Sequence, residues 1–275
     1  MENPLEDYSV LMSVYNKEKP VYLKTSIQSI LNQTVLTNDF VIVCDGPLTG
    51  EVDEVVRDFE KRYPEMIHVV RLKRNVGLGR ALNAGLRHCK NELVARMDSD
   101  DVSLPQRCEE ELRIFEAMDT DIVGGTVQEF ENSTEHITSN RVLPENAEDI
   151  CKFSKKRNPF NHPAVMFRKS KVEEAGGYRE FPYFEDYDLW VRMLRNGAKG
   201  YNIQEPILYM RAGSGMYARR GGLAYVKCIW RFKHYLRKIG YTTNWEFLSS
   251  TLPHVLVGIM PNGMRELVYK KVLRK

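Results

Sequence analysis

The chain has 275 residues, of which 43% are hydrophobic and 28% are charged. These are ordinary globular values, so they exclude a disordered or collagen-like chain and fit one large domain, or one domain with an appendage. The net charge of +3 is unevenly distributed, because residues 218–275 carry twelve Lys or Arg and two acids, which leaves 28 basic and 35 acidic residues in positions 1–217. This asymmetry predicts an acidic body, 1–217, and a basic extension, 218–275, whose partner is an anionic surface.

The five cysteines are scattered and odd in number, and none forms a CxxC pair. Because the N-terminus also lacks a basic segment followed by an apolar one, we expect a cytoplasmic protein without disulfides. The most apolar stretch, FLSSTLPHVLVGIM, is interrupted by Pro253 and His254 and is shorter than the roughly 20 residues of a spanning helix. We therefore expect no integral membrane segment.

In the first half of the chain, apolar runs of strand length alternate with segments of helical periodicity. The expected strands are 8–15, 39–46, 66–72 and 92–98, and the expected helices between them are 20–33, 50–63 and 77–89. Such alternation is typical of βαβ units, so the sequence predicts an α/β fold with a mostly parallel sheet flanked by helices.

The second half is less regular. Ser103 and Gln106 have the spacing of a capping box, which predicts a helix over 104–118. Further along, the expected strands are 121–130, 162–170 and an edge strand at 205–213, and the expected helices are 184–197 and 225–240. The last of these helices combines basic and aromatic residues.

Three carboxylates, Asp98, Asp100 and Asp101, follow the fourth expected strand. Ligands of parallel α/β sheets gather beyond the carboxyl ends of the strands, and carboxylates this close disfavour one another's ionisation unless a cation is present. Mg²⁺ and Mn²⁺ prefer oxygen ligands and share them with phosphates. The alternative is an acidic first turn stabilised by the helix dipole, which accounts for Asp101 better than for Asp98. The cluster alone leaves both interpretations open.

Polar residues and glycines also follow the other three strands of the first half. Tyr15 could pack on a base and Asp45 could accept a hydrogen bond from it, while Gly77 would allow close backbone approach. Either Arg74 or Arg80 could meet a phosphate. These residues favour a nucleotide site, but no GxGxxG follows the first strand, so a dinucleotide-binding fold is disfavoured.

The chain resembles the family 2 glycosyltransferases in six segments that follow one another in the family's order and at similar spacing: YSVLMSVYN, VIVCDG, RNVGLGRALNAGL, ARMDSDD, HPAVMFRKSKVEEAGGY and FEDYDLWVRML. The resemblance runs from about residue 8 to 212 and is closest to bacterial enzymes that build capsules, exopolysaccharides and O-antigens. It implies the GT-A fold, with a Rossmann-like mixed, mostly parallel sheet flanked by helices, here followed by a basic helical C-terminal extension. It also implies sugar transfer with inversion at the anomeric carbon.

The resemblance implies roles for both acidic segments. In the family, D-x-D-type acids bind a divalent ion, Mn²⁺ or Mg²⁺, that bridges the diphosphate of a nucleotide-sugar. This implies that Asp100 is a metal ligand and that Asp98 lies near the ribose and the metal. The family's E-D pair supplies the general base, so the match to FEDYDLW implies that Asp186 takes the proton of the acceptor hydroxyl, with Glu185 touching donor or acceptor.

Other residues match positions around the nucleotide. Tyr15 and Asp45 match positions that line the nucleobase, and Asn75 and Gly77 match the turn beside it. His162 precedes an expected strand and could face the acceptor. However, a lone His before Pro is more often a loop residue with satisfied hydrogen bonds.

The chain departs from the family pattern after the last expected strand. Many relatives have a YR-x-H-like motif there, whereas this chain keeps Arg211 and has Gly213 in place of the His. A His ligand is therefore not expected. We expect Arg211, Arg219 or Arg220 to neutralise the diphosphate instead.

These features predict a metal-dependent inverting glycosyltransferase of bacterial surface polysaccharide synthesis. By the resemblance, the donor is a UDP-sugar and the acceptor is a saccharide linked to undecaprenyl diphosphate. The alternative is a catalytically silent nucleotide-sugar-binding or scaffold subunit, which the presence of both acidic sites disfavours. Helix 225–240 is expected either to lie on anionic lipid at the inner face of the cell membrane or to pack on the catalytic domain. No nucleic-acid-binding motif accompanies the basic residues.

Overall fold

The computed structural model describes residues 5–212 and 221–268. Within 5–212, nine strands form one mixed sheet in the order β3 (Ile67–Arg71), β2 (Asp39–Cys44), β1 (Tyr8–Val14), β4 (Leu93–Asp98), β8 (Val165–Arg168), β6 (Ile122–Phe130), β9 (Gly200–Arg211) and β5 (Val102–Ser103), with β7 (Ile137–Arg141) paired to β6. The helices of the described part are α1 (Pro20–Leu31), α2 (Gly50–Arg62), α3 (Leu78–Leu86), α4 (Arg107–Ala117), α5 (Ala147–Ser154), the 3₁₀ helix η1 (His162–Ala164), α6 (Lys169–Glu174), α7 (Glu185–Arg195), α9 (Leu223–Lys238), α10 (Asn244–Ile259) and α11 (Asn262–Val268).

The first four strands in the chain are parallel, as the βαβ pattern predicts. β1 lies between β2 and β4, with Val14 opposite Cys44 and Ser13 opposite Asp98. The carboxyl ends of these strands are therefore level with one another. As a result, the residues that follow them emerge at one edge of the sheet.

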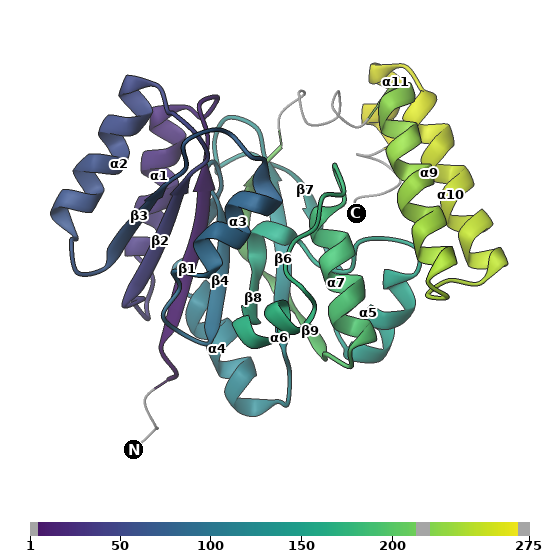
Figure 1. Cartoon of the computed structure of the whole chain (residues 1–275), viewed down its shortest axis with the longest axis horizontal. Helices are drawn as coiled ribbons and strands as arrows, with labels where there is room; N and C mark the ends of the chain where they lie inside the picture. The colour runs from purple at the N-terminus through teal and green to yellow at the C-terminus, as the bar shows by residue number, and fades with distance from the viewer. Residues whose placement is uncertain (1–4, 213–220, 269–275) are drawn as a thin grey trace.

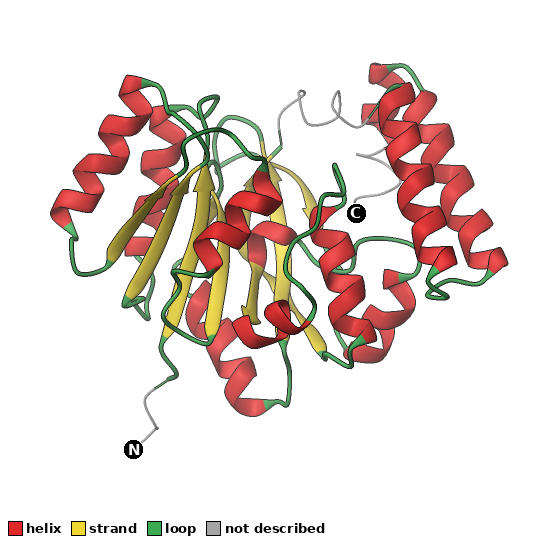
Figure 2. Ribbon diagram, viewed as in Figure 1, coloured by secondary structure: helices red, strands yellow, loops and turns green. Residues whose placement is uncertain are grey.

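Two apolar cores cover the two faces of the sheet. Strands β1 and β2 are therefore buried on both sides, which is why their sequences are almost continuous apolar runs. Helices α1, α2 and α4 pack on one face, and α3, α6 and α7 pack on the other. Figure 2 shows the helices on both sides of the strands. The predicted mixed α/β sheet flanked by helices is confirmed.

The second half of the sheet differs from the βαβ pattern. β8 runs antiparallel to β4 and to β6, whereas β9 runs parallel to β6 along its whole length. The expected strand 162–170 is η1, β8 and the start of α6, and β9 begins five residues before the expected strand. β9 is also not an edge strand, since β5 pairs with its other side.

The expected capping box before α4 is wrong. Ser103 belongs to β5, and α4 begins at Arg107 without a side-chain cap on Gln106. The Gln33 amide donates to the hydroxyl of Ser103 at 3.1 Å, so this serine serves a tertiary contact between β5 and the segment that follows α1.

The C-terminal helices stand at the end of the molecule opposite β3 (Figure 1). α9 packs on α7, where Phe232 and Leu236 join Tyr187 and Val191 in a small buried cluster. The expected domain boundary, 217/218, falls in the segment between the two described ranges. No helix in 5–212 or 221–268 has the length and apolar character needed to cross a bilayer. All five cysteines are free thiols, as expected.

Candidate active site

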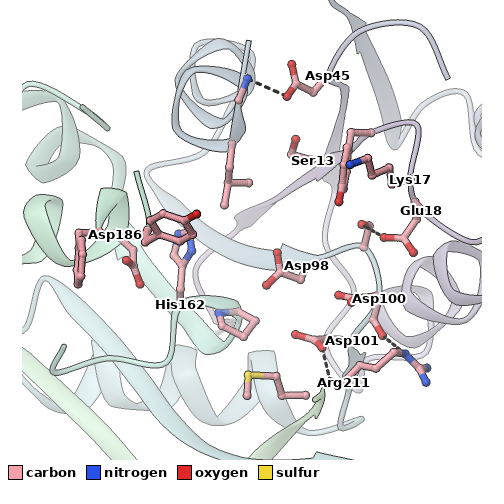
Figure 3. Close-up of a pocket in the computed structure, with 18 of the residues that line it drawn as sticks. Ser13, Lys17, Glu18, Asp45, Asp98, Asp100, Asp101, His162, Asp186 and Arg211 are labelled. Atoms are coloured by element: carbon pink, nitrogen blue, oxygen red, sulfur yellow. Dashed lines mark hydrogen bonds between the residues drawn. The ribbon is translucent and has the colours of Figure 1, made fainter. Parts of the chain in front are cut away.

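A pocket of about 750 Å³ opens beyond the carboxyl ends of β1, β2 and β4 and extends to α7, α9 and α10. The expected site residues that line it are Tyr15, Asp45, Asn75, Gly77, Asp98, Asp100, Asp186 and Arg211. Figure 3 shows Asp186 and His162 on one side of this pocket, Asp100 and Asp101 on the other, and Asp98 between them. The two acidic segments of the sequence, 85 residues apart, therefore meet in one cavity.

Asp45 follows β2 and organises the turn beside the pocket. Its carboxylate accepts hydrogen bonds from the backbone N–H of Val76 at 2.7 Å and of Gly77 at 3.1 Å. The Asn75 amide donates to the Asp45 carbonyl at 3.2 Å. Asp45 thus holds the loop that precedes α3 and also lines the pocket.

Two glycines make this turn possible. Gly77 has φ +87° and Gly46 has φ +86°, a left-handed conformation that disfavours side chains. A Cβ at Gly46 would also stand 2.5 Å from the backbone nitrogen of Asn75. The two loops can approach this closely only because position 46 has no side chain.

Asp98, at the end of β4, is paired with a buried arginine. Arg96 is 1% exposed, and its Nη1 donates to Asp98 Oδ2 at 2.7 Å while Nη2 donates to Oδ1. Residues two apart on a strand point to the same face, which places the two side chains together. The Asp98 charge is therefore already compensated by a protein cation.

Within the part of the chain that the structure describes, neither Asp100 nor Asp101 forms a side-chain ion pair like that of Asp98. Burial, with the neighbouring charges of Asp98 and Glu18, raises the pKa of Asp100 to about 7. Burial, with the charges of Asp100 and Asp98, also raises the pKa of Asp101. Asp101 Oδ1 accepts the Arg211 N–H at 2.7 Å, whereas its buried Oδ2 has no hydrogen-bond partner among the described residues.

These donors fit a divalent cation that is shared with a ligand. Asp100 supplies carboxylate oxygens at the pocket wall, and its raised pKa reflects negative charge that a cation would offset. No group of three or more His, Cys, Asp or Glu in the described ranges is arranged to hold a metal alone. Such a cation would therefore need further oxygens, which a diphosphate can provide.

Arg211, at the end of β9, is fixed beside the acidic loop. Its guanidinium lies over the Tyr22 ring at 3.7 Å and over the Phe130 ring at 4.4 Å. Its Nε donates to the Asp100 carbonyl at 3.0 Å. Arg211 thus brings a positive charge to the pocket while it holds the loop that carries Asp100.

Asp186 lies in the first turn of α7 and faces the pocket from the opposite side. Its Oδ2 accepts from the amide of Asn158 at 2.6 Å, and its Oδ1 accepts from its neighbour's backbone N–H, that of Tyr187, at 2.8 Å. Burial raises the pKa of Asp186, and these two hydrogen bonds together with the charges of Arg141 and Arg96 oppose that rise. A carboxylate with a raised pKa, held in place and open to a cavity, is suited to accept a proton.

His162 lies at the pocket wall and is hydrogen-bonded, as expected for a histidine before proline. Its Nε2 is 3.0 Å from the hydroxyl of Tyr178. Burial and the nearby charge of Arg96 hold the pKa of His162 well below its usual range. His162 is therefore a neutral imidazole between the two acidic segments.

The structure does not bring two of the expected residues into the pocket lining. Arg80 points away and pairs with Glu180 at 2.7 Å. Glu185 begins α7 and packs against Gly79 of α3, and burial raises its pKa to about 7. Three residues of the expected diphosphate region, Gly213, Arg219 and Arg220, lie outside the described residues.

Sequence reasoning missed several pocket residues: Lys17, Glu18, Asn158, Tyr183, Tyr225 and His254. Glu18 follows β1 and hydrogen-bonds Ser99 of the acidic loop, a position that its place after a strand could have indicated. Asn158 lies in the segment NPFNH, close to His162 in the chain. Tyr225 and His254 belong to the C-terminal helices, and nothing in their local sequence pointed to the pocket.

Comparisons with known proteins identify the family of this chain. The model of glycosyl transferase family 2 matches residues 9–175. The chain is 36% identical to the UDP-Gal:alpha-D-GlcNAc-diphosphoundecaprenol beta-1,3-galactosyltransferase of Escherichia coli over 100% of this chain and 99% of that protein. It is 37% identical to the amylovoran biosynthesis glycosyltransferase AmsE of Erwinia amylovora over 96% and 98% of the two chains.

The fold is also similar to that of a solved structure. The structure of S. aureus TarS residues 1–349 with UDP-GlcNAc superposes with a TM-score of 0.70 at 16% identity, covering 97% of this chain and 76% of that one. This likeness agrees with the GT-A fold implied by the sequence. On the match to the family model and to relatives along its whole length, the chain belongs to glycosyl transferase family 2 and is a glycosyltransferase of the polysaccharide-building type.

Proposed function

We propose that the protein transfers a sugar from a UDP-sugar to a saccharide carried on a lipid diphosphate, with inversion at the anomeric carbon. The observation that carries this proposal is the meeting of two different acidic groups in one pocket. Support for the choice of donor and acceptor comes from the E. coli relative, whose name gives UDP-Gal and a diphosphoundecaprenol-linked GlcNAc. Residues 1–217 form the catalytic domain in this proposal, and residues 218–275 form the extension.

The donor lies beyond β1, β2 and β4. Tyr15 and Asp45 line the base, and the turn at Asn75 and Gly77 holds the same end of the nucleotide. A divalent cation, Mn²⁺ or Mg²⁺, held by Asp100 with Asp98 nearby, supplies positive charge to the diphosphate when bound. Arg211 adds a fixed positive charge on this side, and its contact with Asp100 keeps the loop in place.

The acceptor enters from the side of α7. Asp186 accepts the proton of the acceptor hydroxyl as the hydroxyl oxygen bonds to the anomeric carbon, and the bond from that carbon to the diphosphate breaks. Asn158 and the α7 backbone hold the carboxylate in place during this step. One displacement inverts the configuration, so an α-linked donor gives a β-linked product.

A catalytically silent subunit is a poorer fit. Both acidic groups face the pocket, and Asp186 is held by two hydrogen bonds. Two relatives that match almost the whole chain are named as transferases. Because the acceptor in this proposal is carried on a membrane lipid, we place the reaction at the inner face of the cell membrane.

The test is a panel of nucleotide sugars and nucleotides assayed by thermal stabilisation and by transfer, with and without Mn²⁺. We expect one UDP-sugar to stabilise the protein more with Mn²⁺ than without it, and the Mn²⁺-dependent part of the shift to disappear in Asp100→Asn. Asp58→Asn removes an exposed acid on α2 and serves as the matched control; we expect it to show the same Mn²⁺-dependent thermal shift as the parent. A parent protein that no nucleotide sugar stabilises, or an Asp100→Asn variant with an unchanged Mn²⁺ effect, would contradict the proposal.

A further inference from the structure

The C-terminal helices present an apolar face that nothing in the described chain covers. On α10, Trp245, Leu248, Leu252, Leu256 and Ile259 are each between 48% and 76% exposed. At 100° per residue these five positions fall within an arc of about 80° on the helix. Isolated exposed apolar residues are ordinary, but a continuous stripe along a helix marks an interaction surface.

The opposite side of α10 faces the protein. Ser250, Thr251 and Gly258 are buried there, and His254 lines the active-site pocket. α10 therefore separates the pocket from the apolar stripe by its own thickness, about 10 Å. Figure 1 shows α10 on the outer side of α9, so the stripe faces away from the body.

The charged side chains described in α9 and α10 are almost all positive. Lys227, Arg231 and Lys238 are exposed on the neighbouring α9. Glu246 is the one acid whose side chain is described in 221–268, and it is held by the N-terminal cap of α10 at Thr243 and by Lys155 at 3.3 Å. A pair of helices with an exposed apolar face, exposed cations and one described acid complements an anionic bilayer.

We propose that the apolar face of α10 docks on an anionic lipid bilayer and seats the pocket at the membrane surface. This inference rests on the proposed function, because a lipid-linked acceptor gives the docking its purpose. It also assigns the predicted lipid contact to α10 in place of α9, because Phe232 and Leu236 of α9 are buried against α7. α10 has 16 residues, so it lies in the interface and does not span. Trp245, at one end of the stripe, is a residue type that favours this interface.

The test measures co-sedimentation of the full chain with vesicles of phosphatidylethanolamine and phosphatidylglycerol. The double variant Leu252→Gln/Leu256→Gln removes two residues of the stripe, and Leu36→Gln/Met118→Gln removes two exposed apolar residues of the body as the matched control. We expect the parent and the control to bind and the α10 variant to bind at least about tenfold more weakly, because apolar burial drives interfacial binding. Circular dichroism and thermal unfolding check that both variants keep the parent's fold.

A parent that does not bind, or an α10 variant that binds as well as the parent, would overturn the proposal. A third outcome would also overturn it: the parent forms a dimer that does not bind vesicles, and the α10 substitutions convert this dimer to monomers. The stripe would then join two copies of the chain.

A second readout separates this inference from the proposed function. We expect the α10 variant to use a water-soluble, short-chain acceptor as well as the parent does and to lose transfer to a long-chain acceptor in vesicles. Transfer by the parent to neither acceptor would contradict the proposed function, while the sedimentation result would still decide the docking.

Discussion

At the scale of single residues, the two acidic segments of the pocket differ in how their charge is balanced. Asp98 is paired with buried Arg96, whereas Asp100 has neighbouring acids and a raised pKa. Among the described residues, Asp186 has no paired cation at hydrogen-bond distance and is held by the neutral donors of Asn158 and of the α7 backbone. This difference suits Asp100 to share a cation with a diphosphate and Asp186 to accept a proton.

Asn158 should set the pH dependence of the reaction through Asp186. Its amide donates to the ionised carboxylate and so lowers the Asp186 pKa, which burial raises. In Asn158→Ala this contribution is lost, and because the base must be ionised, the acid limb of the kcat profile should move to higher pH. The pH profile of transfer measures this shift.

The matched control is Asn196→Ala, at the exposed C-terminal cap of α7, which should leave the profile unchanged. An acid limb that stays in place in Asn158→Ala would show that Asp186 is not the group whose ionisation governs the rate.

The predicted residues that line the pocket include several with a local signature in the sequence. Asp98, Asp100 and Asp186 sit in motifs that mark strand ends and a helix start, so their place in the pocket could be expected. Arg96 was not expected as a partner of Asp98, although the i, i+2 spacing on a strand puts both on one face, because arginine is rarely fully buried. Arg80 was assigned to phosphate, but its distance from the acids in the fold could not be read from the chain.

At the scale of elements, α9 shows how the basic extension joins the catalytic body. Lys233 lies within the helix interface, 2% exposed, and donates to the Lys156 carbonyl at 2.6 Å. Burial, with the nearby charge of Arg157, lowers the pKa of Lys233 to about 7. An ammonium in this position opposes the packing that Phe232 and Leu236 favour.

Lys233→Met should therefore stabilise the protein at pH 6, where the parent must bury a charged lysine. Between pH 7 and about 10.5 the unfolded parent binds more protons at this residue than the folded parent does, so the parent gains stability as the pH rises. The advantage of the variant should shrink across that window. Chemical unfolding at several pH values measures the difference, and Lys238→Met, on the exposed side of α9, should show no such trend. If the stability difference between Lys233→Met and the parent did not change with pH, the pKa of Lys233 would be the same in the folded and the unfolded protein, which would contradict this prediction.

The elements predicted best are those in which local periodicity and burial agree. The strands and helices of residues 8–98 came within a few residues of their observed bounds, because each buries a face with a clear period. Segment 131–149 has no such period, and β7 and the whole of α5, which begins there, were missed. Pro253 was expected to interrupt the apolar run, yet α10 continues through it. The capping box of Thr243 and Glu246 and the packing on α9 stabilise that helix.

At the scale of the whole molecule, the site is made by two halves with different topologies. The parallel half brings Asp45, Asp98 and Asp100 to one edge, and the mixed half brings Asp186 and Asn158 toward them. The order of the parallel strands could be expected from the βαβ pattern. The antiparallel insertion of β8 between β4 and β6 could not, because strand pairing across distant segments leaves no local trace in the sequence.

The extension completes the pocket rather than standing apart from it. Tyr225 of α9 and His254 of α10 line the cavity, and α10 turns its apolar face outward. Composition alone indicated a basic tail with an anionic partner. It could not indicate which helix faces the body, because both helices carry apolar residues and only packing distinguishes their faces.

The central claim is that one acidic group holds the donor diphosphate while a separate aspartate deprotonates the acceptor. Its most direct test is Asp186→Asn, measured for the Kd of the donor and the kcat of transfer in the same preparation. We predict a Kd within about threefold of the parent and a loss of kcat of at least about 10²-fold, because the base acts only as the acceptor oxygen attacks. Transfer retained at the parent's rate, or donor binding lost together with transfer, would contradict the account.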